Sequence, residues 1–306
     1  MKKIILKCII FCTIFLIILI ILSHIVVPKN NSKEAGMEDE LANGILAEPK
    51  NTIDVLVVGD SESYSSYVPR EVWNEYGITS YVCGNPKQPL TRSMNFIYKT
   101  FKTQKPKIVM LETNTIYRRR SIMYPLYEVT DNILPFFKYH DRWKSLTKND
   151  FFGKINYTTI QDSKGYYYSD IIKSSRPGKY MRRSMSERKI PKLNKLYIEI
   201  MKKYCEKNGA ELVFYSAPSS KNWTYEKHNG VQALANSLGI EFLDLNLKSN
   251  EINIDWNEDS RDKGDHLNYS GAIKVTKYLG KYLYERNIFV DHRGDPNYQE
   301  WNENSN

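Results

Sequence analysis

The sequence predicts an α/β protein in which helices cover both faces of a parallel β-sheet, preceded by one membrane-spanning helix. Two observations predict this architecture. Short β-branched segments alternate with longer helix-like segments along most of the chain, which is typical of parallel sheets. Residues 4–27 are almost continuously apolar, which is typical of a helix that crosses a bilayer.

The apolar N-terminal segment is expected to anchor the protein in the cell membrane. A bilayer core needs about 20 apolar helical residues, whereas the apolar part of a signal peptide has about 7–15. No small-x-small cleavage site precedes Pro28, and Lys2, Lys3 and Lys7 lie at the start of the apolar run. Because such lysines stay in the cytoplasm, we expect a single-pass protein whose main domain is extracellular. A cleaved signal peptide is the alternative.

The rest of the chain is expected to form one domain. Residues 28–51 carry mixed charges and no sustained apolar period, which predicts a linker. Residues 52–290 are long enough for a single sizeable domain with an insertion. Residues 291–306 are predicted to be a C-terminal tail.

Five short segments have the composition of buried parallel strands, and the segments between them resemble helices. The predicted strands are 53–58, 78–83, 107–111, 211–215 and 240–245. The predicted helices are 88–101, 190–207, 221–238 and 270–284. In the last of these, Leu279 and Leu283 lie on one stripe with Lys274 and Lys277 opposite, so this helix should pack on the sheet.

Residues 115–189 interrupt the alternation between the third and fourth strands. This stretch is too long for an ordinary connection, and insertions of that size are usually lids or binding elements. We therefore predict an inserted cap. It carries Arg118, Arg119 and Arg120 and several tyrosines, a composition that suits an acidic glycan or teichoic-acid polymer as substrate. The alternative is that the tyrosines pack the cap and the arginines are solvated.

The charge balance narrows the classes of partner. The chain carries 44 Lys and Arg against 35 Asp and Glu, a formal net charge of +9. A basic surface outside the membrane would meet anionic headgroups and anionic envelope polymers rather than nucleic acid. Solvated lysine-rich faces are the alternative. No cluster of His, Asp or Glu has metal-ligand spacing and no Gly-rich phosphate loop is present, so we expect no metal and no cofactor.

Ser61 is the candidate nucleophile. It ends the tripeptide Gly59-Asp60-Ser61, which follows the first predicted strand where a helix should begin. A serine there presents its hydroxyl at the carboxyl edge of the sheet, and its N–H is one of the unpaired first-turn donors. The same tripeptide also makes a good turn and helix cap, which is the structural alternative.

Two later strands end in residues that suit an oxyanion hole. Gly84 follows the second strand, where a missing side chain lets a backbone N–H approach a reacting carbonyl. Asn114 follows the third strand, where its amide could point at the same oxygen. With the Ser61 N–H they would contribute about 3–4 kcal/mol per well-placed donor. An ordinary turn glycine and an ordinary cap are the alternatives.

His266 is the candidate general base. It lies in the run Asp262 to Ala272, directly before the last predicted helix, where a loop could return it to Ser61. A nearby carboxylate would orient its ring and stabilise the imidazolium. The other four histidines lack this setting.

Taken together, Gly59-Asp60-Ser61, Gly84, Asn114 and His266 resemble the four blocks of the SGNH/GDSL hydrolase family. The resemblance spans about residues 53–283 without the insertion. It implies a flavodoxin-like three-layer α/β/α fold, a Ser-His-Asp triad and attack on esters, commonly O-acetyl groups of polysaccharides. With its N-terminal anchor the chain also resembles the alginate O-acetylation and D-alanyl-lipoteichoic-acid biosynthesis proteins, which act with membrane-bound O-acyltransferases.

The chain departs from the family pattern at the acid. The family usually places its aspartate three residues before the histidine, where this chain has Lys263. A one-residue bulge at Gly264 would let Asp262 serve, whereas adjacent residues such as Asp265 and His266 rarely face each other. We predict Asp262, with Asp259 or no carboxylate as alternatives.

Three functions remain open from the sequence. The first is acyl transfer, mostly of O-acetyl groups, to or from a cell-envelope polysaccharide or teichoic-acid-like polymer through an acyl-serine. The second is a carbohydrate esterase or deacetylase that uses the same residues. The third is a noncatalytic polymer-binding or scaffold protein of a membrane O-acyltransferase complex, for which the irregular aspartate is the main support.

Overall fold

The computed structural model describes residues 1–118 and 132–303, and the chain divides into two compact units. One unit comprises Met1–Glu40 and Ser121–Thr159, and the other comprises Leu41–Arg120 and Ile160–Asn306. Two of the predicted substrate-binding residues, Arg119 and Arg120, lie outside the described residues. The candidate site belongs entirely to the second unit.

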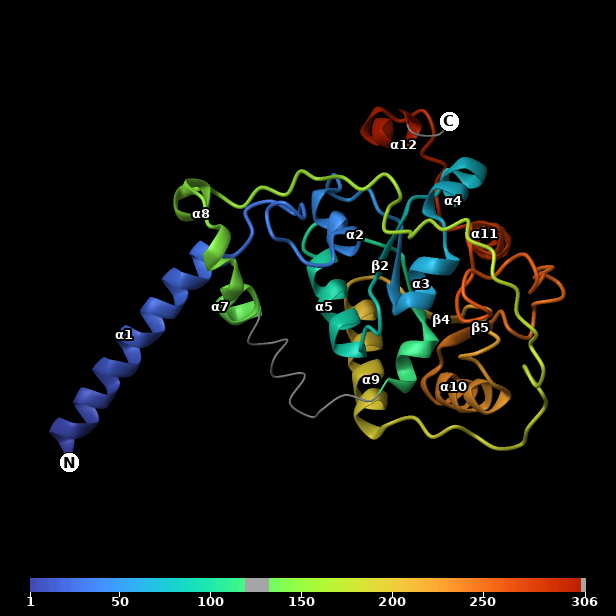
Figure 1. The fold of residues 1–306 in the computed structure, drawn as a ribbon, viewed down its shortest axis with the longest axis horizontal. Helices are drawn as coiled ribbons and strands as arrows, with labels where there is room; N and C mark the ends of the chain where they lie inside the picture. The colour runs from blue at the N-terminus through green and yellow to red at the C-terminus, as the bar shows by residue number, and fades with distance from the viewer. Residues whose placement is uncertain (119–131, 304–306) are drawn as a thin grey trace. The chain divides into compact units, whose positions relative to one another are not determined.

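The second unit is built on a five-stranded parallel sheet, as predicted (Figure 1). The strand order is β2-β1-β3-β4-β5, which is the flavodoxin-like order. The strands are β1 (Val55–Gly59), β2 (Ser80–Gly84), β3 (Ile108–Glu112), β4 (Glu211–Ser216) and β5 (Glu241–Asp244). The first three are buried throughout, because helices cover both faces and the strands are almost entirely apolar.

Two groups of helices cover the two faces of this sheet, so the unit has three layers. On one face lie α5 (Leu90–Thr100), α9 (Lys192–Lys207) and α10 (Tyr225–Leu238), which bury Ile97, Ile198 and Val231 in one core. On the other face lie α3 (Ser61–Ser66), α4 (Pro69–Tyr76) and α11 (Tyr269–Glu285), whose Val72 and Leu279 share a second core. The α/β prediction is therefore confirmed.

The helix α4 is absent from the predicted elements. Pro69 occupies its first turn and Gly77 ends it in the left-handed conformation, with φ of 66°. Both residues are typical helix boundaries. An eight-residue helix spans only about two turns, which is too short to show a clear apolar period. Its position depends instead on tertiary burial of Val72 and Trp73.

The second unit also includes residues on both sides of the predicted domain. Helix α2 (Glu40–Asn43) and the 3-10 turn η1 (Gly44–Ala47) fall in the predicted linker, and Ile45 is buried in the core. The predicted tail forms η4 (Pro296–Tyr298) and α12 (Gln299–Glu303), where the Trp301 ring packs 5.4 Å from the ring of Trp73. Both segments join the second unit because their apolar side chains, Ile45 and Trp301, are buried in its core.

The predicted cap is shared between the two units. Residues 160–189 belong to the sheet-bearing unit and contain neither helix nor strand. This segment follows the edge of the sheet, because the Val82 N–H donates to the Lys164 carbonyl at 2.9 Å. Further along, the Lys173 N–H donates to the Ser260 carbonyl at 2.7 Å. The segment therefore contacts the loop that carries His266.

The first unit contains one helix, α1 (Lys2–Val26), that is long and apolar enough to cross a membrane among the described residues. It has 25 residues, its most apolar window of 18 residues has a mean hydropathy of 3.2, and a signal sequence near the N-terminus would have the same properties. The unit also holds α7 (Phe136–Tyr139), η3 (His140–Ser145) and α8 (Lys148–Phe152) from the predicted cap.

Candidate active site

Ser61 lies where β1 gives way to α3. Asp60 caps this helix, because its Oδ1 accepts the Glu62 N–H at 3.1 Å. Ser61 is the first helical residue and keeps 8% of its surface exposed. The turn needs Gly59, since a Cβ there would lie 2.6 Å from the Cβ of Glu112 on the neighbouring strand. The sequence thus holds the Ser61 hydroxyl at the carboxyl edge of the sheet.

The structure brings Ser61, His266 and Asp262 together. The His266 Nε2 lies 2.8 Å from the Ser61 Oγ, and its Nδ1 lies 2.6 Å from the Asp262 Oδ2. The loop that carries His266 is closed at its base by a β-bridge between Ser260 and Leu267. Serine, imidazole and carboxylate therefore form one continuous hydrogen-bonded chain, which is the arrangement of a nucleophile, a base and an orienting acid.

The loop conformation explains how Asp262 reaches a histidine four residues away. Lys263 and Gly264 both have positive φ, at 66° and 87°, so the chain turns back on itself between the two side chains. The Asp262 Oδ1 accepts the backbone N–H of His266 at 2.7 Å and fixes this turn. A Cβ on Gly264 would lie 2.0 Å from the Ser220 Oγ, so the position needs glycine.

The other carboxylates considered for the triad lie elsewhere. The nearest oxygen of Asp265 is 3.9 Å from the His266 Nδ1, beyond hydrogen-bonding distance. Asp259 is buried and pairs with Lys274 at 2.7 Å, and it also accepts the Ser270 hydroxyl. Asp259 therefore anchors the start of α11.

The charges around His266 favour the protonation states of a catalytic pair. Burial would raise the pKa of Asp262, but hydrogen bonds from the His266 ring and backbone outweigh burial and hold the pKa below its usual value. Burial would lower the pKa of His266, yet the Asp262 hydrogen bond and the charge of Glu62 raise it overall. An ionised Asp262 only accepts hydrogen bonds, so the neutral imidazole carries its proton on Nδ1 and Nε2 can accept from Ser61.

Asn114 lies close to the nucleophile turn. It belongs to the 3-10 turn η2 (Thr113–Tyr117), and its Nδ2 donates to the Asp60 Oδ2 at 3.1 Å. The amide oxygen accepts from the Lys227 ammonium at 3.0 Å, which polarises the amide and strengthens it as a donor. An NH₂ group has two protons, so one remains for a substrate oxygen.

Gly84 has a clear packing role. It ends β2 directly opposite Gly59, and a Cβ there would lie 2.3 Å from the Ser63 Oγ and 3.2 Å from the Asp60 carbonyl. The absence of a side chain therefore lets the nucleophile turn approach the end of β2. This packing is compatible with the oxyanion role predicted for its N–H, which remains a prediction.

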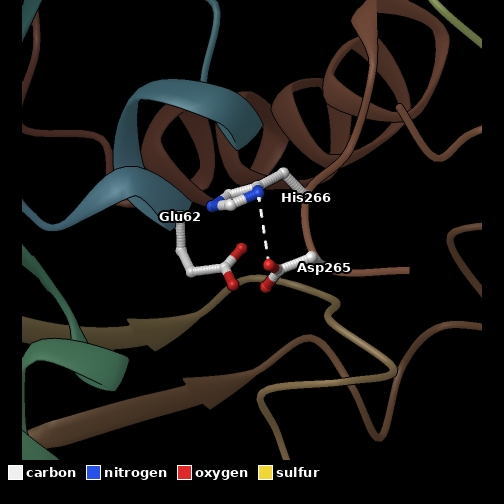
Figure 2. A group of neighbouring side chains, drawn as sticks. All are labelled: Glu62, Asp265 and His266. Atoms are coloured by element: carbon white, nitrogen blue, oxygen red, sulfur yellow. Dashed lines mark ion pairs between the residues drawn. The ribbon is translucent and has the colours of Figure 1, made fainter. Parts of the chain in front are cut away.

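Two buried glutamates border the site, and the sequence analysis did not identify them. Burial raises the pKa of Glu62 to about 7, although the His266 charge opposes the shift. Burial, with the charges of Asp60 and Glu62, also raises the pKa of Glu112 well above its usual value. Figure 2 shows the carboxyl groups of Glu62 and Asp265 facing each other beside the His266 ring. Asn222 joins them, since its Nδ2 donates to both carboxylates.

Glu62, Asp265 and His266 are also the three side chains within the described residues whose positions would allow metal coordination, with ligand atoms within 4.8 Å of one another. Both ring nitrogens of His266 are already hydrogen-bonded, to Ser61 and to Asp262. A cation would therefore have to displace one of these contacts. The hydrogen-bonded arrangement fits acid–base chemistry better than metal binding.

A basic cavity of about 570 Å³ adjoins the site. Its lining residues are Lys87, Asn114, Tyr117, Arg118, Arg188, Asn222 and Lys227. Of the three arginines predicted to bind substrate, Arg118 is the one that the structure describes, and it forms an ion pair with the buried Asp60 at 2.5 Å. Lys227, Arg188 and Lys87 were not identified from the sequence, because they come from three separate segments with no shared motif.

Replacement of Glu62 by glutamine is expected to shift the acid limb of the activity profile to lower pH. His266 must be neutral to accept the Ser61 proton, and the Glu62 charge raises the His266 pKa. Removing that charge lowers the pKa, so activity persists to lower pH. The check is kcat/KM for 4-nitrophenyl acetate between pH 5 and pH 9, with the exposed Glu199→Gln as the charge-matched control.

The same Glu62→Gln variant should be more stable than the wild type at pH 8. Folding raises the pKa of Glu62 from 4.5 to about 7, so the folded chain keeps a proton that the unfolded chain releases between these values. The wild type therefore loses on the order of 3 kcal/mol of stability as the pH rises across that window, and glutamine does not. Equal urea midpoints for the two chains at pH 8, with an unmoved acid limb, would contradict this account.

The chain was compared with known proteins. No protein-family model and no curated protein sequence matches it. Among solved structures, it is similar to a lipase/acylhydrolase from Enterococcus faecalis, with 11% identity and a TM-score of 0.39, over 76% of this chain and 97% of that one. It is also similar to the acetyl xylan esterase AlAXEase, with 10% identity and a TM-score of 0.37, over 76% of this chain and all of that one.

Proposed function

We propose that this chain is a serine-dependent enzyme that transfers an acyl group to or from a cell-envelope polymer, and that the acyl group is acetyl. The observation that carries the proposal is the hydrogen-bonded chain of Ser61, His266 and Asp262, with spacings of 2.8 and 2.6 Å. Such a chain activates a hydroxyl for attack on an ester carbonyl. A scaffold protein would have no need for this alignment.

In the proposed reaction, the Ser61 Oγ attacks the ester carbonyl while His266 takes the serine proton on Nε2. Asp262 holds the imidazolium through Nδ1. The developing oxyanion would be stabilised by the N–H groups of Ser61 and Gly84 and by the free proton of the Asn114 amide. His266 then returns its proton to the leaving alcohol, which departs and leaves an acyl-serine. Water or a polymer hydroxyl completes the cycle by attacking that acyl group.

The proposed location and substrate follow from the anchor and the charge. With α1 in the membrane and lysines at its start, the catalytic unit would lie outside the cell, beside envelope polymers. A net charge of +9 suits an anionic polysaccharide or teichoic-acid-like acceptor. A membrane-bound O-acyltransferase is the expected partner, because it could supply acyl groups at the same surface.

A carbohydrate esterase is the second candidate, since the same three residues serve hydrolysis. The two functions differ in the acceptor of the acyl-serine. The test uses the full-length chain in neutral detergent with 4-nitrophenyl acetate and increasing concentrations of a polyol acceptor. A transferase should release nitrophenol faster as the acceptor rises and should form acetylated polyol. Acetate as the sole product would assign hydrolysis.

The proposal as a whole also has a direct chemical test. A fluorophosphonate probe should form a covalent adduct with the full-length chain, and mass spectrometry should map this adduct to Ser61. Labelling carried out at low pH should be slower, because a protonated His266 cannot accept the serine proton. An adduct on another serine, with Ser61 unmodified, would contradict the proposed nucleophile.

A further inference from the structure

The basic cavity beside Asn114 has a chemistry that the proposed reaction does not use. Of the seven described residues that line it, four are cationic and none is acidic. Four segments form its walls: the turn before α5, the 3-10 turn η2, the segment before α9, and the start of α10. Hydrogen bonds connect these segments. The Tyr117 hydroxyl donates to the Lys227 carbonyl at 2.7 Å, and the Arg188 N–H donates to the Glu226 carbonyl at 2.7 Å.

The buried carboxylates nearby do not account for all of this positive charge. The positive charge of Arg118 is balanced by its ion pair with Asp60. Burial raises the pKa of Glu62 to about 7, so its negative charge at neutral pH is reduced, and burial also raises the pKa of Glu112. Within the described part of the chain, neither Arg188 nor Lys227 forms an ion pair with a carboxylate. The described residues around the cavity therefore carry an excess of positive charge.

Hydrogen bonds hold the Lys227 ammonium in place at the wall of the cavity. Its ammonium donates to the Asn114 Oδ1 at 3.0 Å and to the Asn222 carbonyl, so two of its three protons are occupied. It also lies 5.5 Å from the centre of the Tyr117 ring and 5.8 Å from that of Trp223. Burial lowers its pKa, against the opposing charges of Glu112 and Glu62. An anion in the cavity would return the electrostatic stabilisation that this ammonium lost on burial.

The cavity is continuous with the catalytic residues through two amides. Asn114 lines the cavity and also donates to Asp60, the neighbour of Ser61 in sequence. Asn222 lines the cavity and donates to Glu62 and Asp265, the neighbours of Ser61 and His266. A group bound in the cavity would therefore lie next to the reacting ester.

We propose that Arg188 and Lys227 form an anion subsite in this cavity, which binds a carboxylate or phosphate group of the substrate next to the ester that Ser61 attacks. This inference rests on the proposed function for the identity of the ester, but anion binding itself needs no catalysis. The subsite would select acyl esters on acidic sugars or on polyol phosphates over neutral esters, because a neutral group would leave Arg188 and Lys227 without an anionic partner.

The test measures binding with the full-length Ser61→Ala chain in neutral detergent at low salt. Isothermal titration calorimetry would compare glucuronic acid with glucose, and glycerol 3-phosphate with glycerol. At least one anion should bind at least about tenfold more tightly than its neutral counterpart, and binding should weaken as sodium chloride is added. The stronger of the two anions would identify carboxylate or phosphate as the natural group.

A matched pair of variants assigns the binding to the cavity. Arg188→Gln should weaken anion binding about tenfold, whereas Lys189→Gln, which removes a charge from the adjacent exposed residue outside the cavity, should change it less than about twofold. Lys227→Gln should weaken it further, with thermal unfolding measured to show that the variant is folded. Equal losses in Arg188→Gln and Lys189→Gln would overturn the subsite, as would equal binding of anions and neutral analogues.

The anion subsite and the proposed enzymatic activity can fail independently, and the experiments distinguish the two failures. Wild-type hydrolysis of 4-nitrophenyl acetate without selective anion binding would remove the subsite and leave the enzyme. Selective anion binding without any hydrolysis or fluorophosphonate labelling would keep the subsite and remove the enzyme. In an active chain, Arg188→Gln should also lower the ratio of kcat/KM for acetylated glucuronic acid to that for acetylated glucose about tenfold.

Discussion

The Ser61→Ala chain should fold normally and lose hydrolysis of 4-nitrophenyl acetate by about five to six orders of magnitude. The Ser61 hydroxyl is the group that would bond to the acyl carbon, and alanine leaves no nucleophile within reach of His266. The packing cost is small, because the substitution removes a single oxygen from a short side chain. We expect the free energy of unfolding to change by about 1 kcal/mol or less.

The control for this experiment is Ser66→Ala in the same short helix. Ser66 is also buried, and its hydroxyl donates to the Glu62 carbonyl at 2.7 Å rather than to His266. Its removal tests whether any loss of a hydroxyl from α3 disturbs the site. Activity close to wild type in Ser66→Ala and none in Ser61→Ala would assign the nucleophile. Retained turnover in Ser61→Ala would contradict the proposed chemistry.

The sheet could be predicted from the sequence because its strands are buried on both faces. A strand in that position must be apolar throughout, and the run at 55–58 has that composition and ends at Gly59. Each predicted strand overlaps the observed one, with boundaries that differ by at most two residues. The long helices α9 and α11 were predictable for a similar reason, since three or more turns show an apolar stripe.

The elements that could not be predicted depend on contacts between distant residues. Helix α4 is too short for a period, and its place is set by Trp73, which packs against Trp301 more than 200 residues later in the sequence. The segment at 160–189, which contains neither helix nor strand, has no local signal, because several of its backbone hydrogen bonds go to distant partners in β2, α3, α10 and the loop before α11. Such partners become visible only when the chain is folded.

Some residues of the site could likewise be predicted from their neighbours in the sequence, and others could not. Ser61 and His266 stand in recognisable local settings, directly before helices that the sequence predicts, so their meeting could be expected. Lys227 and Arg188 stand in no motif, and their charges converge only because α10 and the segment before α9 meet beside η2. The sequence analysis selected Arg118, Arg119 and Arg120 instead because they are adjacent in the chain. Of these, Arg118 pairs with Asp60 and the other two lie outside the described residues.

The Asp262→Asn chain should lose about three to four orders of magnitude in kcat, whereas Asp265→Asn should lose less than about tenfold. An asparagine at position 262 can still accept the backbone N–H of His266 through its oxygen, so the loop should keep its shape. Its NH₂ group, however, would face the His266 Nδ1 and force the ring proton onto Nε2. That nitrogen then cannot accept from Ser61, and general-base catalysis fails.

Asp265 provides the matched comparison, because it carries the same charge and lies in the same loop. Its oxygen is 3.9 Å from the His266 Nδ1, so asparagine there removes a charge without changing the ring tautomer. The Asp265 charge raises the pKa of His266, and its loss should move the acid limb to lower pH while leaving the plateau near wild type. A larger loss of kcat in Asp265→Asn than in Asp262→Asn would reassign the acid to Asp265. Small and equal losses in both would instead leave Ser61 and His266 as a catalytic pair without an orienting carboxylate.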